Sequence, residues 1–497
     1  MASLCGPMLI NHFGKECTNL RKLFLPVCIL FLATCGGGGG KSNPAVTFQA
    51  INFITDRYYA IKADKAGEGD HCYIYLEQGR TVSENDILDI IDNFDNTIYP
   101  KVRAAFGEEQ PDVNGDSKIY ILLLDIKDDY PSVNAYISGY FDPVDLYPWI
   151  SNSNGKKILY MDIYPGLYKA PQYSPGNPNP SFINTMAHEF QHMIHQNIKS
   201  ADKIWLNEAM SEIAPFYAFN TPDWKRVETF ETGDNHSDSL TDWGSALPDY
   251  AVVYMWAQYM ADRFPNDVFQ KILAVPNKTG KDSVEDYLVL EHGIDFASVF
   301  RDWSIAIFFG DNTTVFTDNA VWTYKTITSW RSVYNDTHGL FRDPPDGNLN
   351  RAGSRLFGPW SLGYSWYDNT STPLNWTRGV SSTLSASFYD WSSTGGLTFD
   401  MSPDTPYPFD NTAYLILQNA RDIGDAGSVY WSISSPGPLL SSQPDTLPTP
   451  SEKLRKFSNA NANTAVQTRG AVAASAPAEP VPVCMHDIIS HRAEKIK

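Results

Sequence analysis

The chain is poor in cysteine and in positive charge, and it has neither an internal repeat nor an apolar run long enough to span a bilayer. Six cysteines among 497 residues are too few for a disulfide scaffold. The 38 Lys and Arg are outnumbered by 57 Asp and Glu, which gives a formal net charge of −19. Because phosphate binding requires a basic face, this charge excludes nucleic acid as the main partner. The 42% hydrophobic content excludes a disordered chain.

The first 34 residues have the pattern of an export signal. Three basic residues precede a short apolar run from Leu23 to Ala33, which is typical of a secretory signal. The run is too short for a permanent membrane helix, which needs about 20 residues. The string Leu32-Ala33-Thr34-Cys35 resembles a bacterial lipobox, from which Thr34 departs, and the alternative is an ordinary signal peptide. We predict a lipoprotein signal over 1–34, a lipid anchor on Cys35 and a bacterial extracytoplasmic protein that is membrane-anchored or secreted.

Cleavage before Cys35 would leave two further cysteines, Cys72 and Cys484. They are the only pair available if Cys35 is lipidated. Because Cys484 lies near the C-terminus in a segment of tail-like composition, two free thiols are favoured over a bridge.

The remaining chain divides by composition and periodicity into a tether and four stretches. A Gly-rich tether covers 35–45. Residues 46–180 mix short apolar runs of strand character, such as Ile119–Ile126, with one amphipathic helix, which predicts an α/β lobe. That helix has a start signal at Ser83, and Pro100 lies near its end. Residues 181–345 have helical periodicity and form a helical catalytic lobe, whereas 346–436 alternate with period two and indicate a β-sandwich. Ser, Pro, Ala and Asn dominate 437–497, which indicates a disordered tail. The predicted fold class is α+β, with a small all-β sandwich after the two lobes.

One motif carries the chemistry, and it lies on the predicted helix 182–197, for which Ser181 is the start signal. The string His188-Glu189-Phe190-Gln191-His192 is HExxH. Residues four apart lie on one helix face, about 6 Å apart along the axis, so both imidazoles can bind one ion. Zinc prefers neutral imidazole nitrogens in a tetrahedral shell. Glu189 can reach a water on that ion without binding the ion. The alternative, two solvated histidines, is disfavoured because the rest of the helix is apolar.

A catalytic zinc needs a third protein ligand and an open position. Glu208, on a second predicted helix from Ile204 to about Ala214, can return over the first helix if a short loop joins the two; the alternative is an exposed acid. Glu212 lies one turn further on and could accept a hydrogen bond from a ligand imidazole. His195 shares the histidine face but lies about 10 Å from His188 along the axis, too far to bind the same ion.

The combination of HExxH with a downstream helical Glu is the gluzincin pattern. The strings Thr185 to Ile194 and Trp205 to Glu208, with Glu212, resemble the hyicolysin family of neutral metallopeptidases over about residues 50–310. The resemblance implies a zincin-like catalytic unit. By this resemblance His188, His192 and Glu208 would be the zinc ligands, and Glu189 the catalytic acid/base. Glu212 would be the acid that orients a ligand imidazole.

These residues predict a zinc-dependent endopeptidase that hydrolyses protein or peptide substrates through a metal-activated water, with Glu189 as general base. The developing oxyanion needs a further donor, for which Tyr250 is the candidate and Tyr254 and His236 are alternatives. Two other functions stay open at this point. They are a zinc aminopeptidase and an inactive zincin-like surface adhesin.

A weaker motif suggests calcium. Asp112, Asn114 and Asp116 alternate side-chain oxygens as calcium loops do. Ser117 stands where such a loop has glycine, and Leu123 occupies the position of the final Glu. A metal-free turn before a strand is the alternative.

Overall fold

The computed structural model describes most of the chain from residue 44 to residue 327 and parts of the remainder. The described residues are 44–231, 235–309, 320–327, 352–355, 359–367, 375–378, 385–390, 396–398, 413–422, 429–432 and 481–483. The predicted signal peptide, the Cys35 anchor, Cys484 and most of the predicted tail lie outside them and stay predictions. Within these ranges, no helix combines the length and the hydropathy needed to cross a membrane.

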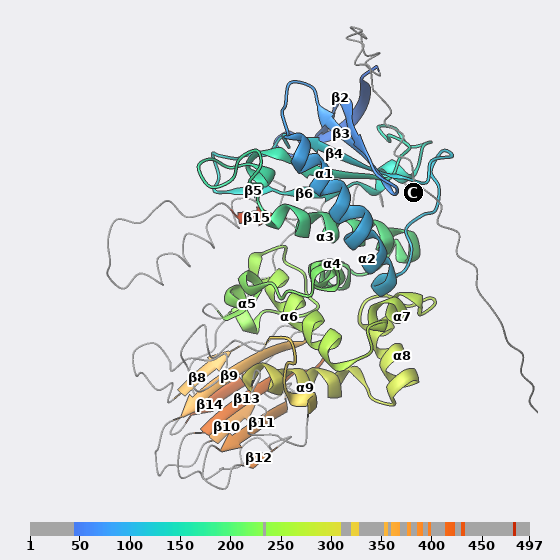
Figure 1. The fold of residues 1–497 in the computed structure, drawn as a ribbon. Helices are drawn as coiled ribbons and strands as arrows, with labels where there is room; N and C mark the ends of the chain where they lie inside the picture. The colour runs from blue at the N-terminus through green and yellow to red at the C-terminus, as the bar shows by residue number, and fades with distance from the viewer. Residues whose placement is uncertain are drawn as a thin grey trace, which may run out of the picture. The chain divides into compact units, whose positions relative to one another are not determined.

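A six-stranded mixed sheet forms the first part of the described chain (Figure 1). Its strand order is β1-β2-β3-β4-β7-β6, with β3, β4 and β7 parallel and the other pairs antiparallel. Parallel strands are typically covered on both faces, and β4 is buried along its whole length. The strand bounds are Val46–Asn52, Arg57–Glu68, Cys72–Glu77, Ile119–Leu124, Ile158–Asp162 (β7) and Gly139–Phe141 (β6).

The two faces of the sheet enter two different cores. On β4, Ile119, Ile121 and Leu123 join the cluster that contains the helices. Tyr120 and Leu122 point the other way and join a second cluster. This is the period-two alternation of a strand, and it leaves one face for the helices that carry the predicted site.

The first helix begins where the sequence predicts. The Ser83 hydroxyl caps α1 (Glu84–Asn93) by accepting the Asp86 amide at 3.2 Å. The prediction that this helix ends near Pro100 is wrong, because a π-turn over Phe94–Ile98 leads directly into α2 (Tyr99–Phe106). Pro100 lies in the first turn of α2, where a missing amide hydrogen costs little.

The predicted HExxH helix is confirmed as α3, Ser181–Lys199. Its start differs from the prediction, since Ser181 is the first helical residue and provides no cap. The Asn179 side chain accepts the Ser181 amide at 3.0 Å instead.

The next helix, α4 (Ile204–Phe219), runs past its predicted end near Ala214. Pro215 lies inside it, although proline removes one helical hydrogen bond. The buried Ala214 and Ala218 keep the last turns within the core. The further helices are α5 (Trp224–Glu231), α6 (Leu247–Arg263), α7 (Val268–Ala274), α8 (Lys281–His292) and α9 (Phe296–Phe309).

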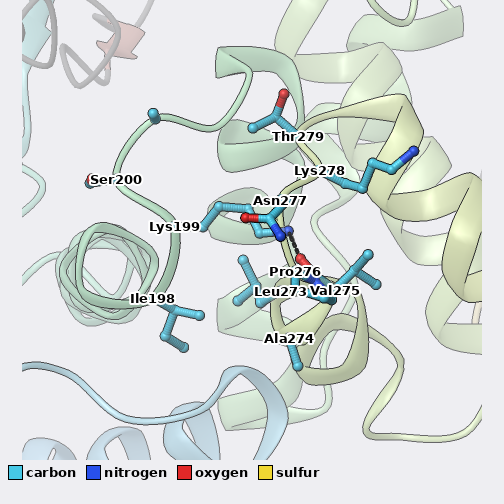
Figure 2. A pocket seen from close by; sticks show the side chains of 11 residues that line it. Ile198, Lys199, Ser200, Leu273, Ala274, Val275, Pro276, Asn277, Lys278 and Thr279 are labelled. Atoms are coloured by element: carbon cyan, nitrogen blue, oxygen red, sulfur yellow. Dashed lines mark hydrogen bonds between the residues drawn. The ribbon is translucent and has the colours of Figure 1, made fainter.

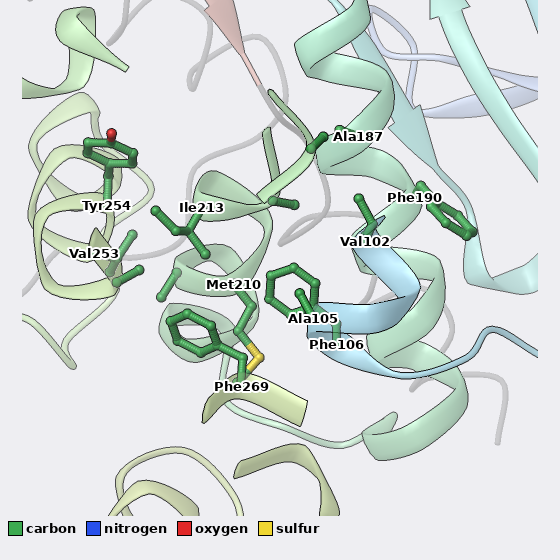
Figure 3. Close-up of a cluster of buried hydrophobic side chains, with 14 of the residues drawn as sticks. Val102, Ala105, Phe106, Ala187, Phe190, Met210, Ile213, Val253, Tyr254 and Phe269 are labelled. Atoms are coloured by element: carbon green, nitrogen blue, oxygen red, sulfur yellow. The ribbon is translucent and has the colours of Figure 1, made fainter. Parts of the chain in front are cut away.

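A hydrophobic core holds these helices together (Figure 3). Phe190 of the HExxH motif packs against Phe94 and Tyr99, with ring centroids 5.5 and 5.7 Å apart. Large buried aromatics of this kind dominate core stability. Phe190, which lies between the two histidines in the sequence, therefore anchors the motif helix in this core. Other members of this core are Val102, Ala105, Phe106, Ala187, Met210, Ile213, Val253, Tyr254 and Phe269.

The later residues form strands, as their period-two pattern predicts. β9 (Ser361–Tyr367), β11 (Ser385–Asp390), β12 (Gly396–Thr398) and β13 (Ala413–Asn419) make a four-stranded sheet in the order β12-β11-β13-β9. A three-stranded sheet, β10-β14-β8, comprises Asn375–Arg378, Val429–Ser432 and Ala352–Arg355. Both sheets are antiparallel. The mixed α+β class is confirmed, whereas the sandwich packing and the domain boundaries stay predictions.

Two acids, Asp142 and Asp145, are buried beside the sheet at 1% exposure each. Tyr58 donates to Asp142 at 2.8 Å, and Tyr160 and the Asn154 amide donate to Asp145 at 2.5 and 2.7 Å. Burial raises the pKa of Asp142 above its ordinary value. Burial and the neighbouring Asp142 charge likewise raise the pKa of Asp145.

These raised pKa values predict a pH-dependent stability. A carboxyl group that binds its proton more tightly when folded stabilises the fold below its unfolded pKa, and this stabilisation is lost as pH rises through the folded pKa. We therefore expect the free energy of unfolding of Asp142→Asn, relative to that of the wild type, to be higher at pH 7.5 than at pH 5. Urea unfolding of both proteins at the two pH values measures this, and an equal difference at both pH values contradicts it.

Candidate metal centre

Three side chains converge between α3 and α4. The Nε2 atoms of His188 and His192 lie 3.1 Å apart. Glu208 Oε2 is 3.7 Å from the first and 3.8 Å from the second. Among the described residues, these three form the group of His, Cys, Asp or Glu whose ligand atoms lie close enough to hold a metal ion, all within 4.8 Å of one another. The structure thus brings together the three predicted ligands.

The spacing of these atoms fits zinc. Tetrahedral ligands about 2.1 Å from an ion lie about 3.4 Å from one another, close to the observed separations. His192 and Glu208 are fully buried, and His188 is 8% exposed. A buried carboxylate is costly without a compensating cation. The donor set of two imidazoles and one carboxylate therefore suits a divalent ion such as zinc.

Neighbouring side chains hold the two imidazoles. His192 Nδ1 lies 2.9 Å from Asn207 Oδ1. Because an amide oxygen only accepts, Nδ1 carries the proton and the Nε2 lone pair faces the cluster. Glu212 Oε1 lies 3.7 Å from His188 Nδ1, on the side predicted for it but beyond hydrogen-bond distance. No role was predicted for Asn207 from the sequence.

Arg226, on α5, completes the surroundings of His188. Its Nε and Nη2 donate to the two oxygens of Glu212 at 2.6 and 2.8 Å. Burial disfavours the guanidinium charge, but the Glu212 carboxylate outweighs this and raises the pKa of Arg226. The bidentate pair fixes Glu212 beside His188. Sequence reasoning missed Arg226, because no spacing links it to the HExxH motif.

Glu189 follows the first ligand in the sequence and is 1% exposed. Glu208 and Glu212, on the next helix, are buried carboxylates as well. A divalent cation would compensate buried carboxylates of this kind. Among the described residues Glu189 is not in the group of potential ligands, and its role as acid/base stays a prediction.

The three oxyanion candidates lie in different surroundings. The buried Tyr250 ring lies 5.2 Å from the Arg226 guanidinium and packs edge-on against Trp243. The Tyr254 hydroxyl accepts the Asp223 amide at 2.7 Å and donates to Gln258 at 3.2 Å, so it is already engaged.

His236 is buried beside Phe230, with ring centroids 6.4 Å apart. Tyr250 is connected to the cluster through Arg226, which pairs with Glu212 beside His188. Its catalytic role stays a prediction.

His195 is fully buried and has a separate partner. Its Nε2 lies 3.0 Å from Asp202, whose other oxygen accepts the Gly280 amide at 2.5 Å. Burial raises the pKa of Asp202, but the hydrogen bond from His195 outweighs it and the pKa is lowered. This pair fastens the loop between α3 and α4 and so sets how Glu208 meets the histidines.

The predicted calcium residues form a tight turn. Asn114 and Gly115 both have positive φ, at 56° and 79°, between the bridged residues Val113 and Asp116. Asp116 accepts the Lys118 amide at 3.0 Å and the Tyr120 hydroxyl at 2.6 Å. Asn114 donates to the Gly155 carbonyl at 3.1 Å. These contacts account for the motif without an ion, and calcium binding by Asp112, Asn114 and Asp116 stays a prediction.

A pocket lies beside the C-terminal end of α3, lined by Ile198–Ala201 and Leu273–Thr279 (Figure 2). Lys199 crosses it and donates to the Val275 carbonyl at 3.0 Å and to Ser283 at 2.9 Å. Its ammonium group is thus used to join α3 to the segment after α7. None of the metal-cluster residues lines this pocket.

Comparison with known proteins agrees with the site. The chain is 30% identical over 256 residues to the neutral metalloprotease ShpI of Staphylococcus hyicus. The matched region is 48% of this chain and 57% of that relative, so the chain spans little more than half the length of the protein that it matches. No family model matches the chain. The similarity supports a relationship to metalloproteases.

Proposed function

We propose that this protein is a zinc-dependent endopeptidase of the hyicolysin type. The observation that carries the proposal is the convergence of His188, His192 and Glu208 within 4.8 Å, with Glu189 buried beside them. The similarity to a neutral metalloprotease supports the same reaction class.

The chemistry divides between the ion and the chain. Zinc, when bound, would lower the pKa of water and polarise the scissile carbonyl. Glu189 accepts the proton of the attacking water and delivers it to the leaving amine, a role worth about 10²–10⁴-fold in rate. Tyr250 is the proposed donor to the oxyanion. His188, His192 and Glu208 hold the ion, and Asn207 and Glu212 orient the imidazoles.

The same proposal includes location and assembly. The leader directs the chain out of the cytoplasm of a bacterium, with Cys35 as a lipid anchor, and a secreted form without the anchor is the alternative. The helical and mixed lobes form one zincin-like unit, and the two later sheets pack as a sandwich. Protein or peptide is the substrate.

We expect Arg226→Gln to weaken zinc binding by about 10–100-fold, the usual cost of losing a residue that orients a ligand. Without the guanidinium, Glu212 loses both of its charge-assisted hydrogen bonds. Competition with a chromogenic chelator measures the affinity. Arg263→Gln is the matched control, because Arg263 pairs with Asp302 at 2.9 Å at 13% and 11% side-chain exposure, away from the cluster. Equal affinities for the two variants would contradict the role of Arg226.

The proposed function is tested by casein cleavage with the chain from residue 36 onward, with and without a chelator. Zinc-restored internal cleavage supports it. Release of single N-terminal residues alone would indicate the aminopeptidase. Bound zinc with no hydrolysis of any protein or peptide would indicate the inactive adhesin.

A further inference from the structure

A short C-terminal strand pairs with a strand near the proposed site. β15 (Val481–Val483) runs parallel to β5 (Ala135–Ile137), with Val481 opposite Ala135, Pro482 opposite Tyr136 and Val483 opposite Ile137. Among the described strands, β15 is the one that pairs with β5. Figure 1 shows the two labels together beside β6 and α3. A segment from the end of the chain therefore covers a strand edge in the first lobe.

Two routes connect β5 to the metal cluster. Ser138 joins β5 to β6, and its hydroxyl lies 3.3 Å from the Thr185 hydroxyl. Thr185 is on α3, three residues before His188, which is about 4.5 Å along the helix axis.

The second route passes through Tyr250, which shares a core cluster with Ala135 and Ile137. Its ring also contacts Arg226, and Arg226 holds Glu212 beside His188. β5 is thus linked to α3 through Ser138, and it shares with Tyr250 the core that leads to Arg226.

The backbone of β5 presents its polar groups to β15 in a way that suits the proline. The Ile137 amide donates to the Asp128 carboxylate at 2.8 Å, so it does not pair with β15. Successive residues of a strand point their amides to opposite sides, so the amide and carbonyl of Tyr136 face β15. In a parallel ladder the Tyr136 amide and carbonyl bond to the two neighbours of the residue opposite. The residue opposite Tyr136 therefore uses no amide hydrogen of its own in the pairing. Pro482 therefore fits at the one β15 position where a missing amide hydrogen costs nothing.

We infer that Val481–Val483, by occupying the β5 edge, acts as a built-in competitor of the substrate. This rests on the proposed function, because it concerns access to the same site. Adding an extended segment to a sheet edge is a general mode of peptide recognition, in which main-chain pairing supplies the affinity. A tethered segment has an effective concentration of about 1 mM. If its intrinsic Kd is about 0.1 mM, the tail raises the apparent KM about tenfold.

The test releases the tail from the folded full chain. A site for a sequence-specific protease is inserted between residues 460 and 461, and hydrolysis of a peptide substrate is measured before and after cutting. We expect KM to fall about tenfold with kcat unchanged, and the synthetic peptide 479–486 to restore the higher KM. Unchanged KM after cutting would overturn the inference, whereas no hydrolysis in either form would overturn the proposed function instead.

Two variants of the full chain and one activity-independent readout complete the test. Val483→Pro removes an amide hydrogen that pairs with β5 and should lower KM as cutting does. Pro482→Ala is the matched control and should leave KM unchanged, because the new amide would point away from β5. Hydrogen exchange of the Tyr136 amide should be slow in the full chain and faster after cutting. Cys484→Ser should leave the KM shift intact, and loss of the shift would overturn the assignment to strand pairing.

Discussion

Glu189→Gln should lower kcat for peptide hydrolysis by about 10²–10⁴-fold while zinc stays bound at the wild-type level. The substitution keeps the size of a side chain that is 1% exposed, so the packing of α3 is retained. What it removes is the group that takes a proton from the attacking water. The measurement is steady-state hydrolysis of casein or a peptide, paired with the zinc content of the same preparation.

The control for this variant is Glu291→Gln, on the exposed face of α8, where the carboxylate is 48% exposed and pairs with Lys271. It should leave kcat within about twofold of the wild type, since exposed pairs contribute little. Full activity of Glu189→Gln would falsify the assignment of Glu189 as general base. Loss of zinc from that variant would reassign it as a ligand.

Glu208→Gln should abolish activity by a different route, through loss of the ion. Glu208 is fully buried and supplies the only carboxylate of the three-residue cluster. A ligand that binds only the folded state stabilises it by about 4.1 kcal/mol when present at 1,000 times its Kd. The wild-type melting temperature should therefore rise with zinc and fall with a chelator. The Glu208→Gln curve should respond to neither.

Glu212→Gln is the graded control on the same helix, one turn further along. Its carboxylate lies 3.7 Å from His188 Nδ1, and Glu212 is not one of the three residues grouped as ligands. We expect it to lose only about 10–100-fold in zinc affinity and to keep a zinc-dependent melting temperature at higher zinc. If Glu208→Gln still responds to zinc as the wild type does, the three-ligand site is wrong.

The ligands could be predicted from the sequence because helix geometry alone places them. Residues four apart share a helix face, so His188 and His192 meet wherever that helix forms. Glu208 followed from the short connection between two helices, which the structure realises as α3 and α4. The buried run of β4 and the Ser83 cap are equally local signals, and both are confirmed.

What could not be predicted depends on packing between distant residues. Arg226 reaches Glu212 from a separate helix, and nothing in their spacing marks the pair. Pro100 follows a π-helical turn and lies in the first turn of α2. Pro215 lies inside α4, among residues buried in the core, although proline usually ends a helix. The pairing of β15 with β5 joins two segments that are far apart in the sequence, and three residues carry too little pattern to reveal it.

A single zinc ion held by His188, His192 and Glu208 would be visible by anomalous diffraction from crystals of the zinc-loaded protein, with data collected on both sides of the zinc absorption edge. We expect one strong peak about 2 Å from both Nε2 atoms and from a Glu208 carboxylate oxygen. A zinc peak at other residues, or none between these three side chains, would show that the proposed site is wrong.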